Sequence, residues 1–459
     1  MLKAPSNRDV RLRPIPMRRL RILAALAAAG FSMPSHALGL MASYHAALEH
    51  DPTFRGARFE REAGEEYEAI GRANLLPNVS LSYSYVNNDA ERSIANQAPA
   101  PLKYDSRASS VSLRQPLFNL DAWQRYKGGQ AQASYSEAKF DTSWQDLISR
   151  LTAAYLDALL AEDQLRLALA QRDAYLENQL ANEKMFEKGA GTRTDMIETR
   201  ARYELAEAAV IEAQNNVANK RHELTVIVGS DPGALDTLGK GLPELPMPFT
   251  LAEWEQMARE RNPEVRAQRH SVQYAHAEVG RNQAGHYPRV DLVASYSNNI
   301  SDPLYTANQS LTQDTTVKAV GVQMVLPLYS GGGVSAQTRQ AAARLASNEA
   351  ELDSALQKSL VEVRKQFQQF SSSRLRMQAM EQAERSATEA VEATRKSVAG
   401  GQRVNLDVLT ALQQLYTTRR DLSDARHGYL LAYLKLHAAA GALDEQSLGR
   451  IAACFRPAE

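Results

Sequence analysis

The sequence predicts a mainly α-helical protein that also carries membrane-spanning β-strands. Three observations support this fold class: a stretch of alternating apolar and polar residues that occurs twice, helical stretches of unusual length around both copies, and an export signal at the N-terminus. The repeated stretch reads PNVSLSYSYVNN at residues 77–88 and PRVDLVASYSNN at residues 288–299. Alternation with a period of two residues is typical of a strand with one apolar and one mostly polar face.

The N-terminal segment, residues 1–37, has the composition of a signal peptide. Three arginines precede an apolar run over residues 22–31, and a small-x-small cleavage site ends at Ala37. Either Met1 or Met17 could be the start of the chain. The apolar run is too short to cross a bilayer, and a buried N-terminal helix is the alternative interpretation.

The first half of the chain reads, in order, as helix, strand, loop, strand, very long helix, glycine break and helix. A helical stretch of nearly seventy residues without proline would be about 100 Å long at 1.5 Å per residue. Prolines and glycines set the expected boundaries, because proline lacks an N–H group and glycine commonly ends a helix. The expected ranges are 40–74, 77–88, 87–106, 107–117, 121–188, 189–191 and 194–228.

The pattern then starts again, which indicates an internal duplication. Asp51-Pro52 corresponds to Asn262-Pro263 at an offset of 211 residues, and the same offset places Pro288 at the position of Pro77. The second half is therefore expected to contain strands at 288–299 and 317–328, with matched prolines that similar helices alone do not explain. The expected division is a signal peptide (1–37), a first repeat (38–228), a linker (229–250), a second repeat (251–440) and a C-terminal tail (441–459).

The strands favour a membrane barrel that several copies of the chain share. About ten residues suffice for a tilted strand to cross a bilayer, and in lipid an open sheet edge is not viable. Four strands are too few to close alone, so two copies would give eight and three would give twelve; the residues do not decide between them. A small soluble hairpin under a helical bundle is the alternative, against which stand tyrosines near the strand ends: Tyr83, Tyr85, Tyr104, Tyr296 and Tyr305.

Short motifs in both halves resemble the TolC family of outer-membrane channel-tunnels. They are Gly189-x4-Thr194-Asp195, Gly401-x-Arg403-x3-Asp407-Val408-Leu409 and Ala425-Arg426-x2-Tyr429-Leu430. The resemblance implies a homotrimer in the outer membrane of a Gram-negative bacterium, with a twelve-stranded barrel embedded in lipid and a periplasmic helical tunnel. It also implies an inner-membrane ABC transporter and a periplasmic adaptor protein as partners.

The order of these motifs is most similar to the type I secretion branch of that family, which exports proteins such as RTX-type toxins and proteases. The outer-membrane component of a multidrug efflux pump is the alternative. A third hypothesis, a periplasmic coiled-coil scaffold without a pore, does not explain the duplicated strands. No GxxxxGK[ST] loop is present, so a partner is expected to supply the energy.

The resemblance also assigns roles to residues beside the two glycine breaks. Thr194, Asp195 and Arg403 would form a latch that holds the periplasmic end shut, with the Asp195–Arg403 link either within one subunit or between subunits. Asp407 would contribute to a ring of carboxylates in the tunnel. Thr410 stands where the family has a second acidic residue, which predicts weaker cation binding. Helix capping by Thr194 is the alternative to the latch. Turns are expected at Gly189, Gly191, Gly400 and Gly401 between helices, and at Pro77, Pro116, Pro288 and Pro327 between strands and helices.

No enzyme activity, cofactor or metal site is predicted. His270, His276 and His286 are spaced six and ten residues apart, which does not place them on one helical face as metal ligands. The only cysteine is Cys454, which excludes an internal disulfide. The formal net charge is zero, which gives no electrostatic case for binding nucleic acid.

Overall fold

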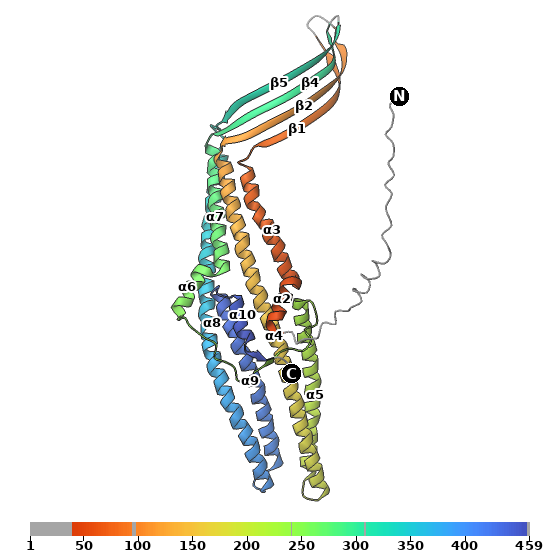
Figure 1. Cartoon of the computed structure of the whole chain (residues 1–459), viewed down its shortest axis with the longest axis vertical. Coiled ribbons are helices and arrows are strands. Elements are labelled where there is room, and N and C mark those ends of the chain that lie inside the picture. Colours follow the sequence, from red (N-terminus) through yellow and green to blue (C-terminus); the bar gives the residue numbers. More distant parts are fainter. Residues whose placement is uncertain (1–38, 94–97, 240, 307–308, 457–459) are drawn as a thin grey trace, which may run out of the picture.

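The computed structural model describes residues 39–93, 98–239, 241–306 and 309–456. The predicted signal peptide lies outside these ranges, and of Tyr305 only the backbone is described. The molecule is elongated, with a four-stranded sheet at one end and, at the other, the turns that connect two pairs of helices (Figure 1). Within the described part of the chain, no helix is both long and apolar enough to cross a membrane.

The sheet is antiparallel throughout and is open at both edges. Its strands are β1 (Asn78–Arg92), β2 (Ala100–Phe118), β4 (Arg289–Thr306) and β5 (Gln309–Val325), in the spatial order β1-β2-β4-β5. β1 pairs with β2 and β4 pairs with β5, so each half of the chain forms one hairpin. β2 pairs with β4 and joins the two halves. The outer edges of β1 and β5 therefore have no partner strand among the described residues.

The strands are longer than expected, so the predicted loop at 87–106 is wrong. The strands have 15 to 19 residues, and most of that segment continues the β1–β2 hairpin. Its polar side chains pair across the two strands, as when Asn87 donates to Asp105 at 2.8 Å and Asn88 to Ser106 at 3.0 Å. A polar composition indicates a loop only where the backbone lacks a partner strand.

Proline does not end the second strand, which corrects the turn expected at Pro116. This residue pairs with Asp291 inside β2, beside an irregularity in the register that precedes Phe118. A bulge tolerates proline because the ladder hydrogen bond is already lost there. The matching strand β5 does end at Val325, before Pro327.

The first helical segment consists of two helices rather than one. α2 (Leu40–His50) and α3 (Pro52–Ala73) meet at Asp51, whose side chain accepts a hydrogen bond from the Phe54 N–H at 2.7 Å. Asp51 is buried and also accepts hydrogen bonds from Arg150 at 3.1 and 3.2 Å. Pro52 at the first helical position explains the break, because it cannot donate a backbone hydrogen bond into a preceding helix.

Two very long helices run along most of the helical part of the molecule. α4 (Leu120–Glu187) has 68 residues and α8 (Gly333–Ala399) has 67, about 100 Å each at 1.5 Å per residue, so the predicted long helix is confirmed. Next to the sheet, α4 packs against α3 and α7 (Pro263–Gln283), and α7 packs against α8. Away from the sheet, α4 pairs with α5 (Arg193–Val228) and α8 with α9 (Asn405–Ala439).

The main hydrophobic core lies where the helices next to the sheet meet the helix pairs farther from it. It contains the fully buried side chains of Tyr155, Trp254, Tyr429 and Tyr433. Shorter elements lie around this core, namely α6 (Leu251–Arg261), α10 (Glu445–Ala452), β3 (Thr237–Leu238) and β6 (Phe455–Arg456). The single turn η1 (Ala284–His286) lies at the other end of α7, next to the sheet. Because β3 pairs with β6, the segment between the halves and the C-terminal segment are joined at this level.

Candidate functional site

The turn between α4 and α5 lies at the end of the molecule far from the sheet (Figure 1). Gly189 adopts a positive φ of 70°, which strains any other residue. Gly191 approaches the preceding helix so closely that a β-carbon would lie 3.1 Å from Met185. Two glycines thus reverse the chain within a few residues.

The cap of α5 is Thr192 and not Thr194, which corrects the capping alternative. The Thr192 hydroxyl accepts a hydrogen bond from the Asp195 N–H at 3.1 Å and donates one to the Asp195 carboxylate at 2.6 Å. Thr194 is exposed in the first turn of the helix. Asp195 therefore lies at the positive end of α5, where its negative charge is stabilised.

The turn between α8 and α9 lies at the same end of the molecule as the first, and we call the two turns the tip (Figure 1). Gly401 has a φ of 73°, Arg403 is exposed, and α9 begins at Asn405 without a side-chain cap. Among the described residues of the single chain, no ion pair joins Asp195 to Arg403. A link between them is therefore left to contacts between copies of the chain.

Asp407 and Thr410 lie one helical turn apart at the start of α9. Asp407 is half-buried and Thr410 is exposed, with its hydroxyl donating to the Leu406 carbonyl at 2.9 Å. Residues three apart lie on the same side of a helix. This side carries one carboxylate, as the sequence predicts, and the role of that carboxylate in the tunnel stays a prediction.

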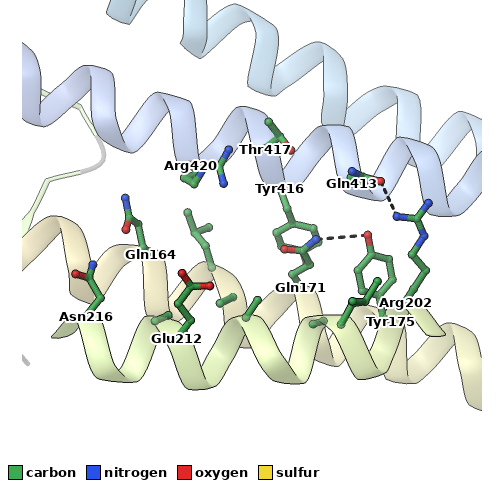
Figure 2. Close-up of a pocket in the computed structure, with 16 residues that line it drawn as sticks. Gln164, Gln171, Tyr175, Arg202, Glu212, Asn216, Gln413, Tyr416, Thr417 and Arg420 are labelled. Atoms are coloured by element: carbon green, nitrogen blue, oxygen red, sulfur yellow. Dashed lines mark hydrogen bonds between the residues drawn. The ribbon is translucent and has the colours of Figure 1, made fainter. Parts of the chain in front are cut away.

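Between the tip and the main core, a groove separates α5 from α9 over the surface of α4 (Figure 2). It encloses about 480 Å³ and is lined by side chains of all three helices. Two hydrogen bonds cross it: the Tyr416 hydroxyl donates to the Ala170 carbonyl at 2.9 Å, and Arg202 donates to Gln413 at 2.9 Å. The sequence carries no signal for this site, because its lining combines exposed polar side chains with buried ones such as Tyr175 and Ala206, a mixture found on any amphipathic helix.

A second hydrophobic core lies next to the tip and is small compared with the main core. Its buried members come from α4, α5, α8 and α9: Tyr175, Ala206, Val391, Val408, Leu409, Leu412 and Leu415. Polar side chains are buried on the same helices, including Asn182, Thr199 and Thr394. Less apolar area is buried here, so the helices near the tip are held together less firmly than those around the main core.

The sheet has two chemically different faces. On one face Ser80 lies beside Ser112 and Ser82 beside Ser110, with hydroxyl–hydroxyl distances of 2.7 and 2.8 Å. The register continues this polar band across β4 to Ser295 and Ser297. The other face carries exposed apolar and aromatic side chains, among them Val79, Leu81, Tyr83, Val111, Tyr296, Val320 and Val322.

This arrangement is what a transmembrane barrel requires. An apolar face can contact lipid while a polar face lines a water-filled lumen. An ion pair lies near the helical end of the sheet, where the exposed Arg114 side chain donates to the buried Asp291 carboxylate at 2.9 Å. The six serines carry no charge, so the middle of the polar face is hydrophilic but electrically neutral.

Comparisons with known proteins match nearly the whole described chain. A model of the outer membrane efflux protein family matches residues 43–230 and 254–442, two stretches that begin 211 residues apart. The proteases secretion protein PrtF of Dickeya chrysanthemi is 39% identical over 96% of each chain. The alkaline protease secretion protein AprF of Pseudomonas aeruginosa is 41% identical over 91% of this chain and 88% of its own.

More distant relatives share the same architecture. The outer membrane protein TolC of Escherichia coli is 30% identical over 94% of this chain and 87% of its own. The outer membrane protein VceC of Vibrio cholerae superposes with a TM-score of 0.75 at 19% identity, covering 88% of this chain and 96% of its own. That solved structure has the same fold.

Proposed function

Because this chain belongs to the outer membrane efflux protein family, which includes TolC, we propose that it is the outer-membrane channel of a type I secretion system. The protein lies in the outer membrane of a Gram-negative bacterium, with its helical tunnel in the periplasm, and its relatives are channel proteins rather than enzymes. The observation that carries the proposal is the pair of relatives near 40% identity that are both named for protease secretion.

The proposed substrate is a secreted protein, such as an RTX-type protease or toxin. The neutral serine band of the sheet suits the passage of an unfolded polypeptide, because hydroxyl groups hydrate the path without binding either sign of charge. The channel itself is passive. An inner-membrane ABC transporter supplies the energy in this proposal, and the exported chain crosses both membranes in one step.

The proposed assembly is a homotrimer with twelve strands. Each chain contributes four strands and leaves the edges of β1 and β5 unpaired, and lipid does not tolerate such edges. Pairing of β1 in one copy with β5 in the next closes the barrel. Three copies also give a lumen wide enough for an extended polypeptide, since barrels of about eight strands are filled by their own side chains.

The periplasmic adaptor is proposed to bind the groove between α5 and α9. The groove is open to solvent near the tip, and small side chains from α5 form part of its wall, including Ala209 and Ala213. A helix of the adaptor could enter where these small residues leave space. The Ala209→Trp substitution should block the groove and abolish secretion while the channel still assembles. Ala208→Trp, on the exposed neighbour that does not line the groove, is the matched control and should secrete normally.

A deletion strain tests the function as a whole. Loss of one large extracellular protein, restored by the wild-type gene, is the expected result. Hypersensitivity to several unrelated drugs with an unchanged set of secreted proteins would instead identify a multidrug efflux component. Comparing culture supernatants and drug sensitivity in the same strains distinguishes these outcomes.

A further inference from the structure

Two positively charged side chains lie on the apolar face of the sheet. Arg107 on β2 is the cross-strand partner of Tyr85, and Lys318 on β5 is the partner of Tyr296. Paired residues, and residues two or four apart along one strand, share a face of a sheet. Both cations therefore lie on the face that carries Leu81, and both are exposed.

Each of these cations lies over a tyrosine ring. The guanidinium carbon of Arg107 is 5.9 Å from the centroid of the Tyr85 ring, and Nζ of Lys318 is 5.8 Å from that of Tyr296. Neither cation forms an ion pair with a side chain that the structure describes. A cation–π contact at an exposed site is weak, so both charges stay available to an anion from outside the chain.

The carboxylates on this face lie toward the hairpin ends, and most already have a donor within the chain. Asp105 accepts a hydrogen bond from Asn87 at 2.8 Å. Asp314 accepts one from Asn298 at 3.0 Å, and Asp89 pairs with Lys103 at 3.1 Å. The described carboxylates here are Asp89, Glu91, Asp105 and Asp314. The face thus changes from apolar to polar near Arg107, where the unpaired charges lie.

This border of the apolar band belongs to the outer leaflet of the membrane. The helices lie in the periplasm, so the hairpin ends point to the cell exterior (Figure 1). The strands run obliquely to the long axis, and β5 lies above β2 in the view of Figure 1. Lys318 is four residues nearer the helices than Asp314, which is in the same row as Arg107, so the slope brings Lys318 toward the depth of Arg107.

The lipid of that leaflet supplies the missing anions. Lipid A, its main glycolipid, carries phosphate groups on its sugar headgroup. Arginine binds a phosphate through two parallel hydrogen bonds, and lysine binds it as a point charge. Arg107 and Lys318 are about 13 Å apart along the strands and about 10 Å apart across them, so they reach different phosphate groups.

We propose that Arg107 and Lys318 form a binding site for the phosphate groups of lipid A on the outer face of the barrel. The tyrosine rings beneath them lie at headgroup depth, where aromatic side chains commonly anchor membrane proteins. The site holds the barrel at a fixed depth in the outer leaflet. It depends on the position of the sheet in the membrane and not on what the channel carries.

The test titrates the purified channel in detergent with lipid A and with dephosphorylated lipid A, and native mass spectrometry counts the bound lipids. Wild type should bind lipid A more tightly than the dephosphorylated form. Arg107→Gln and Lys318→Gln should each weaken lipid A binding about fivefold, because one charge near an anionic lipid surface contributes about that factor. Both variants should bind dephosphorylated lipid A as wild type does.

Lys139→Gln is the matched control. Its Nζ also lies over a tyrosine, 5.8 Å from the Tyr135 centroid, but Lys139 is on α4 and pairs with Glu264 at 3.0 Å. This variant should bind lipid A as wild type does. Equal binding of the two lipids by wild type, which requires no variant to fold, would overturn the proposal. An equal fall in Lys139→Gln would also overturn it, as would displacement of lipid A by excess inorganic phosphate, which would make this a site for a soluble anion.

Discussion

His437 on α9 is a buried titratable side chain in the main core. Its ring packs against those of Trp254 and Tyr433, with centroid distances of 5.0 and 4.1 Å, and its Nδ1–H donates to the Tyr433 carbonyl at 2.9 Å. Burial lowers the pKa of His437 below its ordinary value of 6.5. The folded state therefore keeps this ring neutral, while the unfolded chain takes up a proton near the ordinary pKa.

The sign of the resulting pH dependence follows from this difference. The contribution of His437 to stability is fully present above about pH 6.5 and is lost as the pH falls from there through the folded-state pKa. Each unit by which the pKa is lowered corresponds to about 1.4 kcal/mol. Thermal unfolding between pH 7.5 and 5 should show a fall in Tm that His437→Gln reduces. His50→Gln, at an exposed histidine, is the control; an equal fall in all three proteins would contradict the prediction.

The two threonines beside the first turn show what the sequence could decide at this scale. Both Thr192 and Thr194 follow a glycine pair and precede Asp195, and either is a good cap by residue type. The choice depends on where α5 begins. Gly191, packed against Met185, brings the chain back early enough for Thr192 to take that position. This close contact between helices is not visible in the local sequence.

At the scale of elements, glycines set the distance between α3 and α4. A β-carbon on Gly129 would lie 2.4 Å from the Tyr67 carbonyl oxygen, and one on Gly71 would lie 2.9 Å from that of Arg125. The backbones of the two helices therefore touch. Gly56, also on α3, has open space around the position of its β-carbon.

Alanine at these positions should have opposite effects. Gly56→Ala should stabilise the protein by about 0.5–1 kcal/mol, because alanine favours a helix over glycine by this amount. Gly129→Ala should destabilise it by about 1–3 kcal/mol despite the same gain in helix propensity, because the helices must separate. Tm measurements on the two purified variants check this. A raised Tm for Gly129→Ala would show that the helices are not in contact there.

The alternating faces of β1 provide a second prediction for an element. Leu81 and Ser82 are neighbours on opposite faces of the strand. Arginine at Leu81 would face lipid and cost about 2–4 kcal/mol at the bilayer midplane, less near the interfaces. We therefore expect Leu81→Arg to reduce the amount of channel in outer-membrane fractions. Ser82→Arg should assemble and shift the ion selectivity of the pore toward anions in planar bilayers. Equal assembly defects in both variants would contradict this assignment of faces.

Strand existence was predictable, whereas strand length was not. The alternation of Val79, Leu81 and Tyr83 with serines identifies β1 from the residues alone. Its outer part consists of polar residues such as Asn87 and Asn88, which extend the strand only because Asp105 and Ser106 lie opposite. Pairing between residues some eighteen positions apart is a property of the hairpin. Two-residue strands such as β3 and β6 are still harder to predict, because each exists only through the other.

At the scale of the whole molecule, the duplicated halves meet at the tip without an ion pair between them in the described single chain. Asp195 belongs to the first half and Arg403 to the second, and both lie beside their glycine turns. The latch that the sequence predicts would therefore join neighbouring copies in the assembled channel. Charge-assisted hydrogen bonds suit such a latch, because they are specific and can be broken when the adaptor and transporter engage.

Asp195 hydrogen-bonds to Thr192 at the start of α5, so a substitution that removes its side chain would disturb both the helix cap and the latch. Two substitutions separate these roles. Asp195→Asn removes the charge but keeps an oxygen that can accept the Thr192 hydrogen bond, whereas Thr192→Val removes the cap and keeps the charge. If the latch is an ion pair, Asp195→Asn and Arg403→Ala should each raise the conductance of the closed resting channel in planar bilayers. Thr192→Val should leave it low, and the charge-exchanged Asp195→Arg/Arg403→Asp protein should recover a low conductance. A raised conductance in Thr192→Val alone would instead mean that the fold of the turn, and not the charge pair, closes the tunnel.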